Sequence, residues 1–166
     1  VCRTVIAEVN PTMPRLMGDC MVHVSDVDYL VPVDRPIPEV PPSPPTEAER
    51  KTGENAAELI EDGATLQIGI GAMPEVVCSR LKDRKDLGVH SEMISDAVMD
   101  LVCTGAITNA RKTLHPGKII ATFIMGSRRL YDWLDGNPLV EMHPVSYTNN
   151  PAVIAQNRNM VAVNAA

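Results

Sequence analysis

Aromatic side chains and clusters of basic side chains are both scarce in this sequence. Phe, Trp and Tyr make up only 3% of the 166 residues, and the formal net charge is -6. Proteins that bind single-stranded nucleic acid stack bases on aromatic rings, and proteins that bind duplexes or membrane surfaces carry basic patches. The composition therefore argues against a nucleic acid or a membrane surface as the partner.

Long apolar runs are also missing. No segment approaches the eighteen or so consecutive apolar residues that a membrane-spanning helix needs, and the first residues lack the basic and apolar pattern of a signal peptide. We therefore expect a cytoplasmic protein with no membrane partner.

Metal-binding and disulfide patterns are absent from the spacing of cysteine and histidine. No C-x-x-C pair occurs, and no histidine lies at ligand spacing from a cysteine. The sequence therefore predicts no metal site and no disulfide framework, and it favours reduced thiols and structural histidines. The residues concerned are Cys2, Cys20, Cys78, Cys103, His23, His90, His115 and His143.

A proline-rich stretch divides the chain. Residues 36–45 contain six prolines, which remove backbone donors and favour extended geometry, so this stretch is expected to be a linker. Before it, β-branched runs at 5–9, 21–24 and 29–33 predict short strands. We interpret 1–35 as the end of an amino-terminal α/β domain and 46–166 as the start of a carboxy-terminal α/β domain, and we expect the chain to be truncated at both ends.

After the linker, strand and helix patterns alternate. Thr46 and Glu49 form a capping-box signature, and Pro74 favours the start of another helix. The order predicts an α/β fold with a mostly parallel sheet, helices on both faces and ligands at the carboxyl ends of the strands. The expected helices are 46–62, a segment from Pro74, 95–104, 128–134 and 150–155, and the expected strands are 65–69, 118–124 and 160–163.

A glycine turn follows the first strand after the linker. Gly69, Ile70, Gly71 and Ala72 lie between this strand and the next helix, where backbone amides can approach an anion and the helix adds its positive end. The segment matches neither the dinucleotide-binding nor the P-loop pattern, so a tight turn without a ligand is an equally good interpretation.

Hydroxyl and carboxylate side chains gather at residues 90–96. His90 and Ser91 are adjacent, so in an extended segment they point to opposite faces, which argues against a Ser-His-Asp triad. Asp96 is better explained as a residue of a helix start, where acids are stabilised. Active-site residues of open α/β sheets lie at strand ends of this kind, so residues 90–96 are a candidate segment for chemistry.

Several ordered blocks of the sequence carry a resemblance to a known family. They are residues 5–10, 13–15, 69–74, 85–93, 113–118, 125–132, 149–157 and 159–161. These blocks resemble the acetyl-CoA hydrolase/transferase family, and within it the 4-hydroxybutyrate CoA-transferase branch. The resemblance runs along nearly the whole chain and corresponds to the middle of the longer family polypeptide.

The resemblance implies a class I CoA-transferase in which Glu92 is the nucleophile and forms a glutamyl-CoA thioester. It also implies an acyl-CoA and a small carboxylate of the 4-hydroxybutyrate, acetate or butyrate class as substrates. Coenzyme A would be a substrate, with no permanently bound cofactor. The turn at Gly69, Ile70, Gly71 and Ala72 resembles the first CoA-binding loop of the family, and Asn149 resembles a residue near the carboxylate pocket. Asn149 is equally well explained as a turn residue. For the full-length enzyme, the resemblance implies a homo-oligomer.

Two alternatives remain open at this point. An acetyl-CoA hydrolase would use the same Glu92 but let water open the intermediate, and a truncated non-catalytic module would bind a partner without chemistry. A later glycine-rich segment of the family would lie beyond Ala166, so we expect the isolated chain to be a weak or inactive catalyst.

Overall fold

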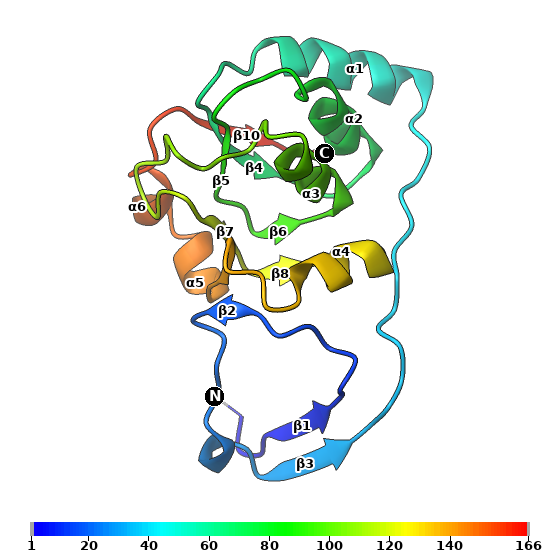
Figure 1. Cartoon of the computed structure of the whole chain (residues 1–166), viewed down its shortest axis with the longest axis vertical. Helices are drawn as coiled ribbons and strands as arrows, with labels where there is room; N and C mark the ends of the chain where they lie inside the picture. The colour runs from blue at the N-terminus through cyan, green and yellow to red at the C-terminus, as the bar shows by residue number, and fades with distance from the viewer. Residues whose placement is uncertain (1, 166) are drawn as a thin grey trace.

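The computed structural model describes residues 2–165, and Figure 1 shows two unequal parts joined by an extended segment. In the smaller part, β1 (Ile6–Val9) and β3 (Tyr29–Pro32) pair in parallel. The chain then runs without regular structure from residue 33 to α1 (Glu47–Glu58). The short strand β2 (Met17–Gly18) pairs with a strand of the larger part. The division into 1–35, 36–45 and 46–166 stays a prediction.

The strand expected at 21–24 is wrong. A 3₁₀ turn, η1 (Val24–Asp26), forms there instead, and residues 21–23 have no regular structure. The Nδ1 atom of His23 accepts a hydrogen bond from the amide of Ser25, and the carbonyl of His23 accepts one from Asp26. These local bonds satisfy backbone groups that a strand would have to pair with a neighbour.

The larger part is built on parallel strands. One sheet has the order β10-β4-β5, another has the order β2-β9-β7, and an isolated parallel bridge between His90 and Ile120 joins them. A last pair, β6 and β8, is also parallel. The bounds are β4 (Thr65–Ile68), β5 (Gly88–Val89), β6 (Met93–Ile94), β7 (Ile119–Ala121), β8 (Phe123–Ile124), β9 (Val140–Met142) and β10 (Met160–Val163). The mixed α/β fold with parallel strands, which the alternation predicts, is confirmed.

Helices pack around the parallel strands of the larger part (Figure 1). Helices α1 and α2 pack against each other, and α3 packs against α2 and α4. The further bounds are α2 (Ala72–Arg80), α3 (Asp96–Cys103), α4 (Arg128–Leu134), α5 (Val145–Thr148) and α6 (Pro151–Ile154). In the part of the chain that the structure describes, no helix has the length and apolar character that crossing a membrane requires.

Local sequence signals explain where helices begin. The side chain of Thr46 accepts a hydrogen bond from the amide of Glu49, and the carboxylate of Glu49 accepts one from the amide of Thr46, which completes the expected capping box. A glycine is needed inside α1, because a Cβ atom at Gly53 would lie only 2.7 Å from the side chain of Val76 on α2. The close contact of α1 and α2 therefore depends on Gly53.

The core lies between these helices and the sheet. Leu66 on β4, Val77 on α2 and Ile119 on β7 are completely buried. Burying one such side chain contributes about 1.5–3 kcal/mol. The core fixes the strands, and with them the loops at their carboxyl ends.

Candidate active site

Glu92 follows β5 and is half-buried. Its carboxylate oxygen Oε2 accepts a hydrogen bond of 2.6 Å from the side-chain amide of Asn149. Asn149 follows α5 and is exposed. The structure therefore brings together two site residues that the sequence predicted separately and that stand 57 positions apart.

The backbone at Glu92 departs from regular strand pairing. Its carbonyl accepts hydrogen bonds from two successive amides, those of Thr122 at 2.8 Å and Phe123 at 3.0 Å. Thr122 and Phe123 thus stand opposite the single residue Glu92, which is the pattern of a β-bulge. A β-bulge changes the direction of side chains and occurs often beside active sites. The strand expected at 118–124 is therefore divided into β7 and β8, and the division lies opposite Glu92.

A cavity of about 300 Å³ surrounds the Glu92 carboxylate. Gln67 on β4 and Asn164 after β10 line it, and their side-chain amides form a reciprocal pair with bonds of 3.1 and 2.9 Å. Neither residue was predicted as a site residue from the sequence. Gln67 does carry a signal in the sequence, because it is a polar residue inside an apolar strand.

His90 lines the same cavity and supports the Asn149 segment. Its Nε2 atom lies 2.9 Å from the carbonyl of Thr148, and since a carbonyl can only accept, Nε2 carries the proton. Burial lowers the pKa of His90, which favours the neutral ring. The ring therefore holds the backbone immediately before Asn149.

The glycine turn lies at the carboxyl end of β4, and β4 pairs with β5, the strand that leads to Glu92. The amide of Gly69 donates to the carbonyl of Val163 at 2.8 Å, so it serves sheet pairing. Within residues 2–165, the amides of Ile70 and Gly71 form no hydrogen bond. Gly71 has φ of 125° and precedes α2, so the turn presents free amides at a helix start.

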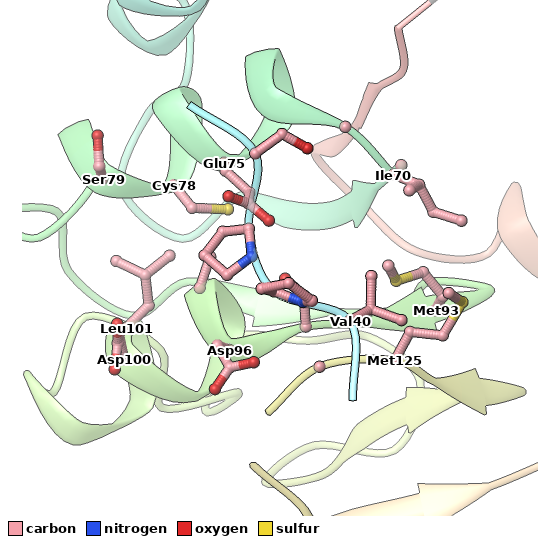
Figure 2. A pocket seen from close by; sticks show the side chains of 18 of the residues that line it. Val40, Ile70, Glu75, Cys78, Ser79, Met93, Asp96, Asp100, Leu101 and Met125 are labelled. Atoms are coloured by element: carbon pink, nitrogen blue, oxygen red, sulfur yellow. The ribbon is translucent and has the colours of Figure 1, made fainter. Parts of the chain in front are cut away.

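The turn does not line the Glu92 cavity. Gly69, Ile70 and Gly71 line a neighbouring cavity of about 270 Å³, closed on one side by the proline-rich segment around Val40 (Figure 2). Ala72 is the first residue of α2 and is buried. Asn164 lies between the two cavities. It lines the cavity of Glu92, and its Oδ1 atom is so close to Gly69 of the other cavity that a Cβ atom added to Gly69 would lie 2.6 Å from it.

The second cavity has three acidic residues, Glu75, Asp96 and Asp100, and one basic residue, Lys82, in its lining. Figure 2 shows Glu75 and Asp96 on either side of it. Burial, followed by the charge of Asp96, raises the pKa of Glu75. Asp96 accepts bonds from the amide and hydroxyl of Ser127, so it ties the start of α3 to the start of α4. This supports the structural interpretation of Asp96.

Ser91 has a structural role, because its hydroxyl binds the backbone of the neighbouring strand. Its hydroxyl donates to the carbonyl of Ile68 and accepts from the amide of Ile68, both at 3.1 Å, and the side chain is buried. A hydroxyl committed to two backbone bonds is not free to attack a substrate, which agrees with setting a serine triad aside.

Comparison with known proteins identifies the family of the chain. Residues 126–166 match the model of the acetyl-CoA hydrolase/transferase C-terminal domain. The 4-hydroxybutyrate coenzyme A transferase of Clostridium kluyveri is 56% identical over 162 residues, which cover 98% of this chain. The chain belongs to the acetyl-CoA hydrolase/transferase family.

Other family members are similar over the same length. The succinyl-CoA:acetate/propanoyl-CoA:succinate CoA transferase of Fasciola hepatica is 48% identical over 96% of the chain. The crystal structure of 4-hydroxybutyrate CoA-transferase from Porphyromonas gingivalis superimposes with a TM-score of 0.92 at 45% identity over 97% of the chain, and RipA from Yersinia pestis with 0.90 at 42% over 96%. The chain spans 38% and 34% of the two transferase sequences, and 41% and 37% of the two solved chains.

Proposed function

We propose that this chain supplies the nucleophile of a CoA-transferase, and that the nucleophile is Glu92. The observation that carries the proposal is the hydrogen bond between Glu92 and Asn149 inside a cavity at the carboxyl ends of parallel strands. The family membership and the transferase names of the relatives support the same chemistry.

The proposed reaction proceeds through two anhydrides. The Glu92 carboxylate attacks the acyl-CoA carbonyl, and CoA leaves as a thiolate while a mixed anhydride forms. The thiolate then attacks the glutamyl carbonyl, which releases the first carboxylate and leaves a glutamyl-CoA thioester. The acceptor carboxylate attacks this thioester to form a second anhydride, and the thiolate attacks its acyl carbon to give the new acyl-CoA. Because an activated bond is retained at every step, no ATP is needed.

Asn149 has a defined role in these reaction steps. It donates to Oε2 of Glu92, which leaves Oε1 free to attack. When the thiolate attacks the glutamyl carbonyl, negative charge develops on Oε2, and the Asn149 amide already points at that atom. A donor placed where charge develops stabilises the transition state.

The free amides of Ile70 and Gly71 are proposed to contact CoA. They lie at the start of α2, where the helix dipole favours negative charge. The lining of the same cavity has three acidic side chains and one basic one, Lys82, and this excess of acidic groups disfavours a phosphate deep inside it. We therefore assign these amides to the thioester or pantetheine part of CoA. The substrates proposed are an acyl-CoA and a small carboxylate of the 4-hydroxybutyrate, acetate or butyrate class.

The test is to trap the intermediate on a family-length protein that carries this chain. Incubation with acyl-CoA should add CoA to the peptide that contains Glu92, as measured by mass spectrometry, and Glu92→Gln should abolish both adduct and exchange. Glu58→Gln, at an exposed position of α1, is the matched control. An adduct on a cysteine would contradict the proposal. Release of free CoA without exchange into acetate or butyrate would identify a hydrolase, and no adduct and no turnover would identify a non-catalytic module.

A further inference from the structure

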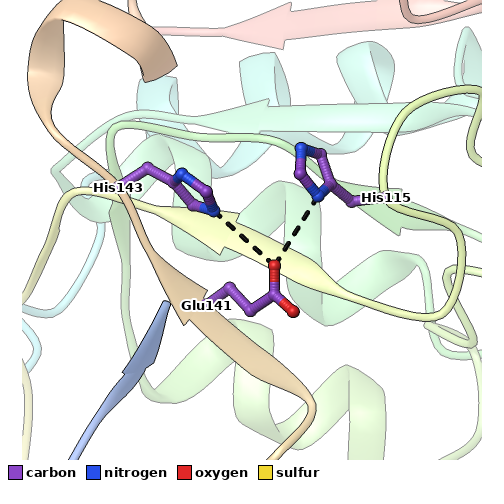
Figure 3. Close-up of side chains that lie close together, drawn as sticks. All are labelled: His115, Glu141 and His143. Carbon is purple, nitrogen blue, oxygen red and sulfur yellow. Dashed lines mark ion pairs between the residues drawn. The ribbon is translucent and has the colours of Figure 1, made fainter. Parts of the chain in front are cut away.

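Two histidines and a glutamate converge on the side of the sheet next to α5 (Figure 3). Glu141 lies on β9, and His143 follows two residues later, so strand alternation places both side chains on the same face. His115 comes from the loop before β7, the strand that pairs with β9. His115 is distant in the sequence from the Glu141 and His143 pair, which is why the spacing of histidines alone did not predict this cluster.

The donor atoms have the separations of a metal site. Oε2 of Glu141 lies 3.6 Å from Nδ1 of His115 and 3.6 Å from Nε2 of His143. One ligand atom from each residue lies within 4.8 Å of the others. The point in the plane of three atoms with these separations that is equidistant from them lies no more than about 2.4 Å from each, close to the ~2.0–2.2 Å bonds of zinc to imidazole and carboxylate.

The contacts are poor as direct hydrogen bonds. At 3.6 Å, neither imidazole is within hydrogen-bond distance of the carboxylate. The Nε2 atom of His143 is buried and has no hydrogen-bond partner in the part of the chain that the structure describes. A buried polar atom without a partner is costly, and a cation between the three groups would satisfy it.

Neighbouring side chains orient the ligands as the surroundings of metal sites do. Nε2 of His115 lies 2.7 Å from the hydroxyl of Tyr147, so its other ring nitrogen is left for Glu141. The ring of His143 stacks on Tyr147 with centroids 4.9 Å apart. Lys118 approaches Oε1 of Glu141 at 3.7 Å, which leaves Oε2 for an ion.

We propose that His115, Glu141 and His143 bind a divalent transition-metal ion of the zinc class. Two imidazoles and one carboxylate are a ligand set that zinc prefers, and a water molecule would complete four ligands. The ion would link β9 and the start of α5 to the loop before β7. It would therefore brace the segment that leads to Asn149, without contact with Glu92.

The experiment uses Zn²⁺ and Co²⁺ alone as probes of the chelator-treated protein. Isothermal titration should show one equivalent of Zn²⁺, and Co²⁺ should give a visible absorption spectrum of low coordination number. Glu141→Gln and His143→Ala should each weaken Zn²⁺ affinity at least ~100-fold, and Tyr147→Phe, which keeps all three ligands, by ~10–100-fold. His23→Ala, at an exposed histidine immediately before η1, is the matched control and should bind as the wild type does.

Two results would overturn the proposal: a folded wild type that binds neither ion, or Zn²⁺ affinity that is the same in wild type, Glu141→Gln and His143→Ala. The wild-type Co²⁺ spectrum decides the question even where a ligand variant does not fold. Exchange activity is not the readout, so failure of this proposal is distinguishable from failure of the Glu92 proposal.

Discussion

The sharpest perturbation of the proposed site is Asn149→Ala, which removes the amide from Oε2 of Glu92. The substituted side chain is exposed, and its only side-chain hydrogen bond in the described residues is the 2.6 Å bond to Glu92. A hydrogen bond to a charged group contributes about 1.5–3 kcal/mol. Because 1.36 kcal/mol corresponds to a factor of ten, we expect the exchange rate to fall by about 10- to 150-fold.

The assay follows the transfer of CoA between two acyl groups in a family-length protein. Asn149→Ala should lower kcat, since the lost donor acts on charge that develops in the transition state. Its melting temperature should stay close to that of the wild type, because no core contact is removed.

Asn150→Ala is the matched control one residue away. The side chain of Asn150 caps α6 by accepting a bond of 2.9 Å from the amide of Ala152, and it has no bond to Glu92. This variant should lose about 1 kcal/mol of stability and retain kcat. Equal kcat in Asn149→Ala and wild type, or equal losses of kcat in the two variants, would refute the assignment of Asn149.

Three further outcomes follow from burial and capping. Burial raises the pKa of Cys78 to about 12, so iodoacetamide at pH 8 should modify the exposed Cys20 at least ~10³-fold faster, as peptide mass spectrometry would show. Thr46→Ala should lower the free energy of unfolding by about 1 kcal/mol, measured by urea denaturation, because the amide of Glu49 loses its acceptor. Burial lowers the pKa of Lys112 from 10.5 to about 7, so between these pH values the unfolded chain holds a proton that the folded chain lacks. The stability of the wild type relative to Lys112→Met should therefore rise with pH in this window, by at most about 1.4 kcal/mol per pH unit, and a fall would contradict the assignment.

Local signals in the sequence predicted much of the fold. The capping box at Thr46, the helix expected at 150–155 and the strands expected at 65–69 and 160–163 each correspond to an element in the structure. These signals are local, because a cap or a strand run is recognised within a few residues. The helix expected to start at Pro74 begins two residues earlier, at Ala72, since the free φ of Gly71 allows the chain to enter the helix directly.

Short strands that depend on distant partners were missed. β2 has two residues and pairs only with β9, more than 120 positions away, and β9 has three residues and lies between β2 and β7. No run of β-branched residues marks β2. The same limit applies to the site, where the pairing of Gln67 with Asn164 links residues 97 positions apart.

The division of the strand at 118–124 joins the fold to the proposed chemistry. The apolar run predicts one continuous strand, and its composition gives no sign of a break. The break arises because the amides of Thr122 and Phe123 both bind the carbonyl of Glu92, so the backbone of Glu92 is held from the neighbouring strand. Its side chain is held from a different element, through Asn149 after α5. Because both its backbone and its side chain are held, Glu92 would lose little conformational freedom on binding an acyl-CoA. The proposed nucleophile has no activating base, so its reactivity would depend on such positioning before the substrate binds.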